Sequence, residues 1–147
     1  MEKQTLHLLN EVNRAIIQFR GIYSAWSSIH HISYHEMLVL YTIREKGFCN
    51  QKQICNRYLL PRQTINNVIT KFRKGGILTI SEEYSHGREK GFVLTEKGRQ
   101  YAQPLLKSLN DVETEAVELL GKDKLEALTE LMLEYDQALN HALREKR

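Results

Sequence analysis

The residues best suited to bind a charged ligand lie in the segment 85–98, whose sequence is SHGREKGFVLTEKG. Gly87 and Gly91 bracket a charged stretch that contains Arg88 and Lys90. Arginine and lysine donate hydrogen bonds to phosphate oxygens, and glycine permits a tight turn and a close approach of the backbone to a ligand. The sequence therefore predicts a glycine-bounded tip whose two cations contact a polyanion.

A second group of candidate residues lies in the segment 61–74, PRQTINNVITKFRK, which contains no acidic residue. Pro61 suits the first position of a helix because its missing N–H costs nothing there, and Gly75 follows as a termination signal. The apolar residues are spaced so that they form one narrow buried stripe, namely Ile65, Val68, Ile69 and Phe72. The rest of the helix is expected to face solvent.

The exposed side chains of this helix are of the types that form hydrogen bonds and apolar contacts with the base edges of DNA. Asparagine and glutamine pair with adenine, arginine pairs with guanine, and the threonine methyl group contacts thymine. Base contacts are predicted for Arg62, Gln63, Asn66 and Asn67, because the N-terminal half of such a helix usually makes them. Contacts to DNA are also predicted for Thr64, Thr70 and Lys71. Of these, Thr64 and Lys71 are expected to bind phosphates. The alternative interpretation is that these side chains lie on an ordinary solvent-exposed helix face and bind no ligand.

The distribution of charge supports a polyanionic partner. Residues 41–100 carry twelve Lys/Arg against five Asp/Glu, whereas residues 101–147 carry six against ten and residues 1–40 balance. A basic middle between neutral and acidic ends indicates one face suited to nucleic acid. An ordinary solvated surface would also accommodate this modest imbalance.

The elements that must position these residues are mostly helical. A long first helix is predicted from an apolar stripe at helical spacing, namely Leu6, Leu9, Val12, Ile16, Phe19, Tyr23 and Trp26. Ser33 and Glu36 form a capping box ahead of a second helix that Gly47 ends. Asn50 can cap a short helix over residues 51–58.

Strand-like residues 77–80 and 92–94 predict a two-stranded hairpin with a long flexible tip. Two helices broken at Gly121 follow, and their apolar residues repeat at heptad-like spacing suited to packing on other helices. Along the second of them these residues are Leu125, Leu128, Met132, Tyr135, Leu139 and Ala142.

The whole pattern resembles the MarR family of winged helix-turn-helix transcription regulators. The resemblance rests on the helix pair in QKQICNRYLLPRQTINNVITKFRKGGIL and on the wing sequence ending in Leu-Thr-Glu-Lys-Gly at residues 94–98. It implies a mostly α fold with a small β-hairpin wing, in which N- and C-terminal dimerisation helices flank the core. In domain terms, one MarR-like domain would span 1–147, with the DNA-binding lobe at 33–98 and the dimerisation helices at 1–30 and 99–147.

The family further implies a homodimer that binds double-stranded DNA at a pseudo-palindromic operator, commonly as a repressor. In many members a small aromatic or phenolic acid binds between the dimerisation and DNA-binding regions and releases the DNA. The residues of this chain that could line such a pocket are Phe19, Tyr23, Trp26, His30, Met37 and Tyr41. Aromatic residues at helical spacing also form plain core, which is the competing interpretation.

One position departs from the family pattern. The family usually has an aspartate two residues before the wing arginine, where it helps to orient that arginine, and here the position holds His86. Three alternatives follow: Arg88 is less pre-organised than in the family, an acidic residue of the hairpin (Glu82, Glu83 or Glu89) orients it instead, or a protonated His86 itself contacts phosphate.

Other classes of protein are disfavoured. The sequence has no phosphate loop, nucleophile elbow or convincing carboxylate pair, so no enzyme and no cofactor are expected. His31 and His35 are four residues apart, but Ser33 caps a helix between them, so with His30 they are not expected to bind metal. No apolar run is long enough to cross a membrane and no signal peptide is evident, so a cytoplasmic protein is expected. The alternatives left open are a winged-helix module that binds protein and a metal-responsive regulator of the same fold.

The two cysteines are expected to stay reduced. A bridge between Cys49 and Cys55 would be geometrically poor, because Cys55 is expected inside a helix. The family's peroxide sensors carry a reactive cysteine near the start of the chain, and residues 1–48 contain none.

Overall fold

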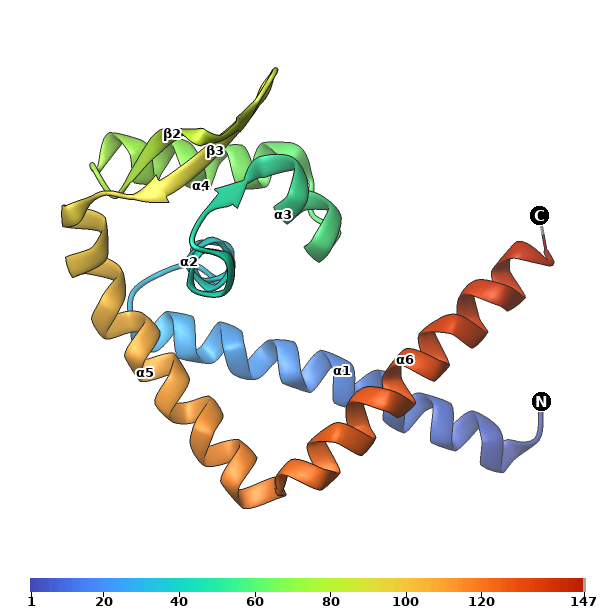
Figure 1. The fold of residues 1–147 in the computed structure, drawn as a ribbon. Coiled ribbons are helices and arrows are strands. Elements are labelled where there is room, and N and C mark those ends of the chain that lie inside the picture. The colour runs from blue at the N-terminus through green and yellow to red at the C-terminus, as the bar shows by residue number, and fades with distance from the viewer. Residues whose placement is uncertain (147) are drawn as a thin grey trace. The chain divides into compact units, whose positions relative to one another are not determined.

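The computed structural model describes residues 1–146 and is dominated by helices (Figure 1). Residues Met1–Leu106 form one compact unit, and the chain from Lys107 onward forms a second. The elements in chain order are α1 (Lys3–Ile29), α2 (Tyr34–Lys46), β1 (Cys49–Asn50), α3 (Gln51–Tyr58), α4 (Arg62–Lys74), β2 (Leu78–His86), β3 (Glu89–Leu94), α5 (Glu96–Leu120) and α6 (Lys122–Arg144). The predicted mostly helical class with a small β wing is confirmed.

Local capping signals set the helix ends where the sequence predicted them. The Ser33 hydroxyl accepts from the Glu36 amide at 3.0 Å, and the Glu36 carboxylate accepts from the Ser33 amide at 2.7 Å, which completes the capping box of α2. Gly47 ends α2 in the left-handed conformation, with φ of 80°. The Asn50 side chain accepts from the Gln53 amide at the start of α3.

Pro61 differs by one position from the prediction. It is the residue before α4 rather than its first helical residue, and its backbone is extended, with ψ of 140°. The following residues behave as predicted, because the apolar stripe of α4 is buried. It joins α2, α3 and the sheet in one core, whose most buried members include Val39, Leu40, Ile54 and Ile65.

The sheet has three strands, not two. Its order is β1–β3–β2 and both pairs are antiparallel, with Cys49 opposite Phe92 and Leu78 opposite Leu94. The two-residue strand β1 was not predicted. It has no periodic pattern of its own and exists because β3 offers a second edge for pairing.

The wing is longer and more regular than a flexible tip. Its turn contains only Gly87 and Arg88, since His86 pairs with Glu89 across it. Gly87 has φ of 60°, as the first position of a type II′ hairpin turn requires. Gly91 was predicted to bound the tip and instead lies inside β3, opposite Ser81.

A bulge in β2 separates the two paired parts of the wing. The register shifts between Ser81 and His86, and the Ser85 hydroxyl fills the gap by donating to the Ser81 carbonyl and accepting from the Gly91 amide. Gly91 is required here because a Cβ atom would lie 2.3 Å from the Tyr84 carbonyl oxygen. Bulges of this kind bend and twist a hairpin.

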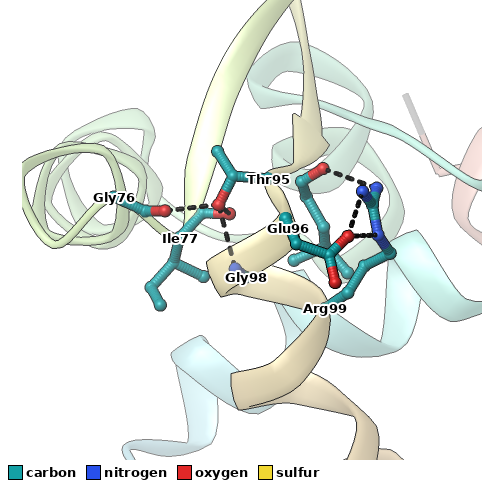
Figure 2. A network of polar contacts seen from close by, with 7 residues as sticks. Gly76, Ile77, Thr95, Glu96, Gly98 and Arg99 are labelled. Atoms are coloured by element: carbon teal, nitrogen blue, oxygen red, sulfur yellow. Dashed lines mark hydrogen bonds and ion pairs between the residues drawn. The ribbon is translucent and has the colours of Figure 1, made fainter.

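Thr95 links the segment after α4 to the end of the wing and the start of α5 (Figure 2). Its hydroxyl donates to the Gly76 carbonyl after α4 and accepts from the Gly98 amide in the first turn of α5 at 2.9 Å. Its own amide donates to the Ile77 carbonyl at 3.0 Å. Arg99 adds a link by donating to the Leu94 carbonyl and to the Glu96 carboxylate.

Apolar side chains remain exposed on the terminal helices when a single chain is considered. In α1, most of the predicted stripe is exposed, including Leu6, Val12, Ile16 and Phe19, whereas Trp26 is buried. In α6, no described residue is buried, and Leu128, Met132 and Leu139 are exposed. Among the described residues, no helix has the length and apolar character required to span a membrane.

Candidate nucleic-acid interface

Helix α4 presents the predicted polar face to solvent. Its buried stripe packs into the core, and Arg62, Gln63, Asn66, Asn67, Thr70 and Lys71 are exposed while Thr64 is half-buried. No acidic residue lies on this helix. The structure therefore leaves every predicted base-contacting side chain of α4 accessible to a ligand.

Two of these side chains are already paired with each other. The Gln63 side-chain amide donates to the Asn67 side-chain oxygen at 2.8 Å, one helical turn away. The bond fixes the orientation of both amides. Asn67 keeps its own amide hydrogens free of this bond, so it can still donate to a base edge.

Lys71 is not a free cation, in contrast to the expectation that it holds a phosphate. Its Nζ atom lies 2.6 Å from Oε1 of Glu36 in the capping box of α2. Burial alone would raise the pKa of Glu36, but the hydrogen bonds from Lys71 and Ser33 outweigh burial and hold that pKa below its usual value. The same contact with Glu36 raises the pKa of Lys71. Both groups are therefore ionised at neutral pH.

The predicted wing cations are exposed near the hairpin turn. Arg88 occupies the turn itself and Lys90 lies in β3 just after it. His86 lies at the end of β2 and pairs through the backbone with Glu89. This arrangement places two cations at the end of a tightly turned hairpin that projects beyond α4 (Figure 1).

A basic groove between α4 and β2 adds residues that sequence reasoning did not select. The groove has a volume of about 440 Å³ and is lined by Thr70, Arg73, Lys74, Leu78 and Thr79. Only Thr70 was among the predicted contacts. Arg73 and Lys74 lie in the last turn of the acid-free helix, so the absence of acids over the whole segment was the signal that could have identified them.

Half of the predicted effector residues line a cavity of about 300 Å³ within the first unit. Tyr23, Met37 and Tyr41 contribute to it, together with Tyr34, Leu38, Arg57 and Tyr58. The other three predicted residues do not line it. Phe19 is exposed, and Trp26 is buried against His30 with ring centroids 4.5 Å apart.

The cavity has a cation in its wall that the sequence did not reveal. Arg57 on α3 lies 2.8 Å from the carboxylate of Glu45 on α2, and this contact raises the pKa of Arg57. Phenol groups and a guanidinium together can bind a small aromatic acid. Glu45 would compete with the ligand carboxylate for Arg57.

The histidines near the end of α1 do not converge. His31 lies in the turn after α1 with a positive φ of 56°, and His35 lies in α2 beyond the Ser33 cap. Within residues 1–146, no group of three or more metal-ligating side chains was found.

The two thiols are expected to differ in reactivity. Burial raises the pKa of Cys49 to about 12, so at pH 8 only about one molecule in ten thousand carries its thiolate. Cys55 is half-buried. Iodoacetamide at pH 8 is therefore expected to alkylate Cys55 well before Cys49 in the native protein, as peptide mass spectrometry would show. Equal labelling before and after addition of urea would contradict the burial of Cys49.

Known structures with this arrangement were identified by comparison of the fold. NMB1585, a MarR family regulator from Neisseria meningitidis, superposes with a TM-score of 0.84 at 23% identity, over 95% of this chain and 99% of that chain. The chain has the fold of the MarR family. Neither the protein-family models nor the curated proteins that were searched match the sequence.

Two further structures with the MarR fold contain ligands. MarR from Staphylococcus aureus in complex with salicylate and kanamycin has a TM-score of 0.69 at 15% identity, covering 95% of both chains. NadR in complex with 4-hydroxyphenylacetate has a TM-score of 0.66 at 16% identity, covering 92% of this chain and 93% of that chain. Salicylate and 4-hydroxyphenylacetate, the ligands of those two proteins, are small aromatic acids.

Proposed function

We propose that this protein is a sequence-specific, DNA-binding transcription regulator. The observation that carries the proposal is the acid-free, exposed face of α4 beside a wing that bears Arg88 and Lys90, on a fold shared with MarR family regulators. α4 would enter the major groove, and the wing would lie against the backbone or in the minor groove. The cytoplasm, where chromosomal DNA is accessible, is the proposed location.

The exposed apolar faces of the terminal helices support a homodimer. Leu6, Val12 and Ile16 of α1, and Leu128 and Leu139 of α6, would otherwise remain in water. Two-fold symmetry would present two recognition helices to half-sites about one turn of DNA apart. An operator bound in this way would be pseudo-palindromic, and its occupation would repress transcription.

A small aromatic or phenolic acid is the proposed effector. The cavity beside α2 offers tyrosine hydroxyls, apolar walls and the Arg57 guanidinium, and two proteins of the same fold bind such acids. Its occupation would displace α2, which contacts α4 directly. The predicted DNA contacts lie on α4, so the ligand would alter DNA binding through this packing.

The proposal is tested by titrating the purified protein with fragments of its own genome at two salt concentrations, with and without salicylate. Selective binding to a palindromic fragment that weakens steeply with salt, and weakens further with salicylate, is the expected result. Selective binding that salicylate leaves unchanged would reject this effector class. Absence of binding at low salt would reject DNA as the partner and favour a winged-helix module that binds protein.

A further inference from the structure

We propose that Glu36 withholds Lys71 from DNA, so that the recognition helix carries one cation fewer than its sequence indicates. The inference rests on the proposed function as a DNA-binding protein. It concerns one ion pair, between the first turn of α2 and the last turns of α4, whose partners lie 35 residues apart in the sequence.

Both oxygens of the Glu36 carboxylate are occupied. Oε1 accepts from Lys71 at 2.6 Å, and Oε2 accepts from the Ser33 amide at 2.7 Å. The capping box fixes the carboxylate at the start of α2, so the partner that can leave is Lys71.

The two partners differ greatly in exposure. The side chain of Glu36 is 6% exposed, whereas that of Lys71 is 69% exposed. If Lys71 moved to a DNA phosphate, a carboxylate in a poorly hydrated site would lose its cation, which is strongly unfavourable. Lys71 would gain only an exposed, salt-screened contact in return. The balance favours retention of the ion pair when DNA binds.

Among the described residues, Lys71 is the cation that acts on the Glu36 carboxylate. Tyr101 of α5 faces it, and burial and the negative charge of Glu36 raise the pKa of that phenol while Lys71 opposes them. Tyr101 is thus neutral at neutral pH. The neighbourhood holds one anion and one cation that cancel each other on the side of α4 next to Asn67.

Replacement of Glu36 by glutamine removes the negative charge but keeps the capping box. Its side-chain oxygen can accept from the Ser33 amide, because glutamine serves the same role as glutamate in a capping box. Glu36→Gln therefore keeps the start of α2 and releases Lys71. Lys71→Gln removes the cation and leaves the rest of the exposed face of α4 unchanged.

The experiment is a double-mutant cycle of the wild type, Glu36→Gln, Lys71→Gln and the double variant, with DNA affinity measured across a range of salt concentrations. Lys71→Gln is expected to leave the slope of log affinity against log salt unchanged. Glu36→Gln is expected to steepen it by about 0.9, which corresponds to roughly an eightfold gain in affinity at 0.1 M salt. The double variant should return to the wild-type slope.

A matched control is Glu45→Gln, which removes another ion-paired glutamate of α2, the partner of Arg57. It changes the net charge equally and should not steepen the slope. Steepening by this control would show a general charge effect and overturn the proposal.

Two other results would overturn it. A slope lowered by about 0.9 in Lys71→Gln alone would mean that Lys71 already binds phosphate. An unchanged slope in Glu36→Gln would mean that the released lysine does not reach DNA. If Glu36→Gln does not fold, the comparison of Lys71→Gln with the wild type still shows whether Lys71 binds phosphate. Failure of all four proteins to bind DNA would instead reject the proposed function.

Discussion

Replacement of Gly98 by alanine is expected to lower the free energy of unfolding by about 3 kcal/mol. A Cβ atom at this position would lie 2.1 Å from the carbonyl oxygen of Ile77. That oxygen is backbone and also accepts from the Thr95 amide, so it cannot move aside without breaking the junction between the wing and α5. Urea denaturation followed by circular dichroism measures the loss.

Gly21 supplies the matched control for this substitution. It lies inside α1, and an added Cβ atom would meet nothing within 4 Å. Gly21→Ala should therefore raise the stability by about 0.5–1 kcal/mol, because alanine is the better helix former. Equal stability of the two variants would show that the close approach of Gly98 to Ile77 is not a constraint.

Replacement of Asn67 by alanine is expected to change which DNA sequences are bound, whereas replacement of Arg88 by alanine should weaken binding to all of them. Asn67 lies on the exposed face of α4 and is oriented by Gln63; loss of a bidentate base contact costs about 1–3 kcal/mol of discrimination at one base pair. Loss of Arg88 should reduce the salt slope by about 0.9. Competition among single-base variants of the operator measures the sequence preference, and titration at several salt concentrations measures the slope.

Two controls match these substitutions in chemistry. Asn110→Ala removes an exposed asparagine of α5 in the second unit, and Arg14→Ala removes an exposed arginine of α1. Neither should alter sequence preference or salt dependence. If Asn67→Ala behaves like Asn110→Ala, Asn67 does not read a base.

The helix boundaries were predictable because local interactions set them. The capping box at Ser33, the left-handed Gly47 and the Asn50 cap each join residues a few positions apart, and each is in place. The buried stripe of α4 was predictable for the same reason, since helical spacing alone decides which residues share a face. These signals were sufficient to predict the helix ends and the exposed face of α4.

Features that depend on contacts between distant residues were not predictable. The strand β1 exists through pairing with β3, and the partner of Lys71 lies on another helix. The wing bulge depends on Ser85, whose sequence context resembles any polar loop. The cavity beside α2 is also lined by Arg57 and Tyr58 of α3, which spacing along α1 and α2 could not reveal.

The contacts of Thr95 hold three parts of the first unit together. They fix the end of α4, the base of the wing and the first turn of α5 to one another (Figure 2). A displacement of the first turn of α5 would therefore move the end of α4 and the base of the wing together. Their common orientation would change while the distance between the end of α4 and the base of the wing stayed the same.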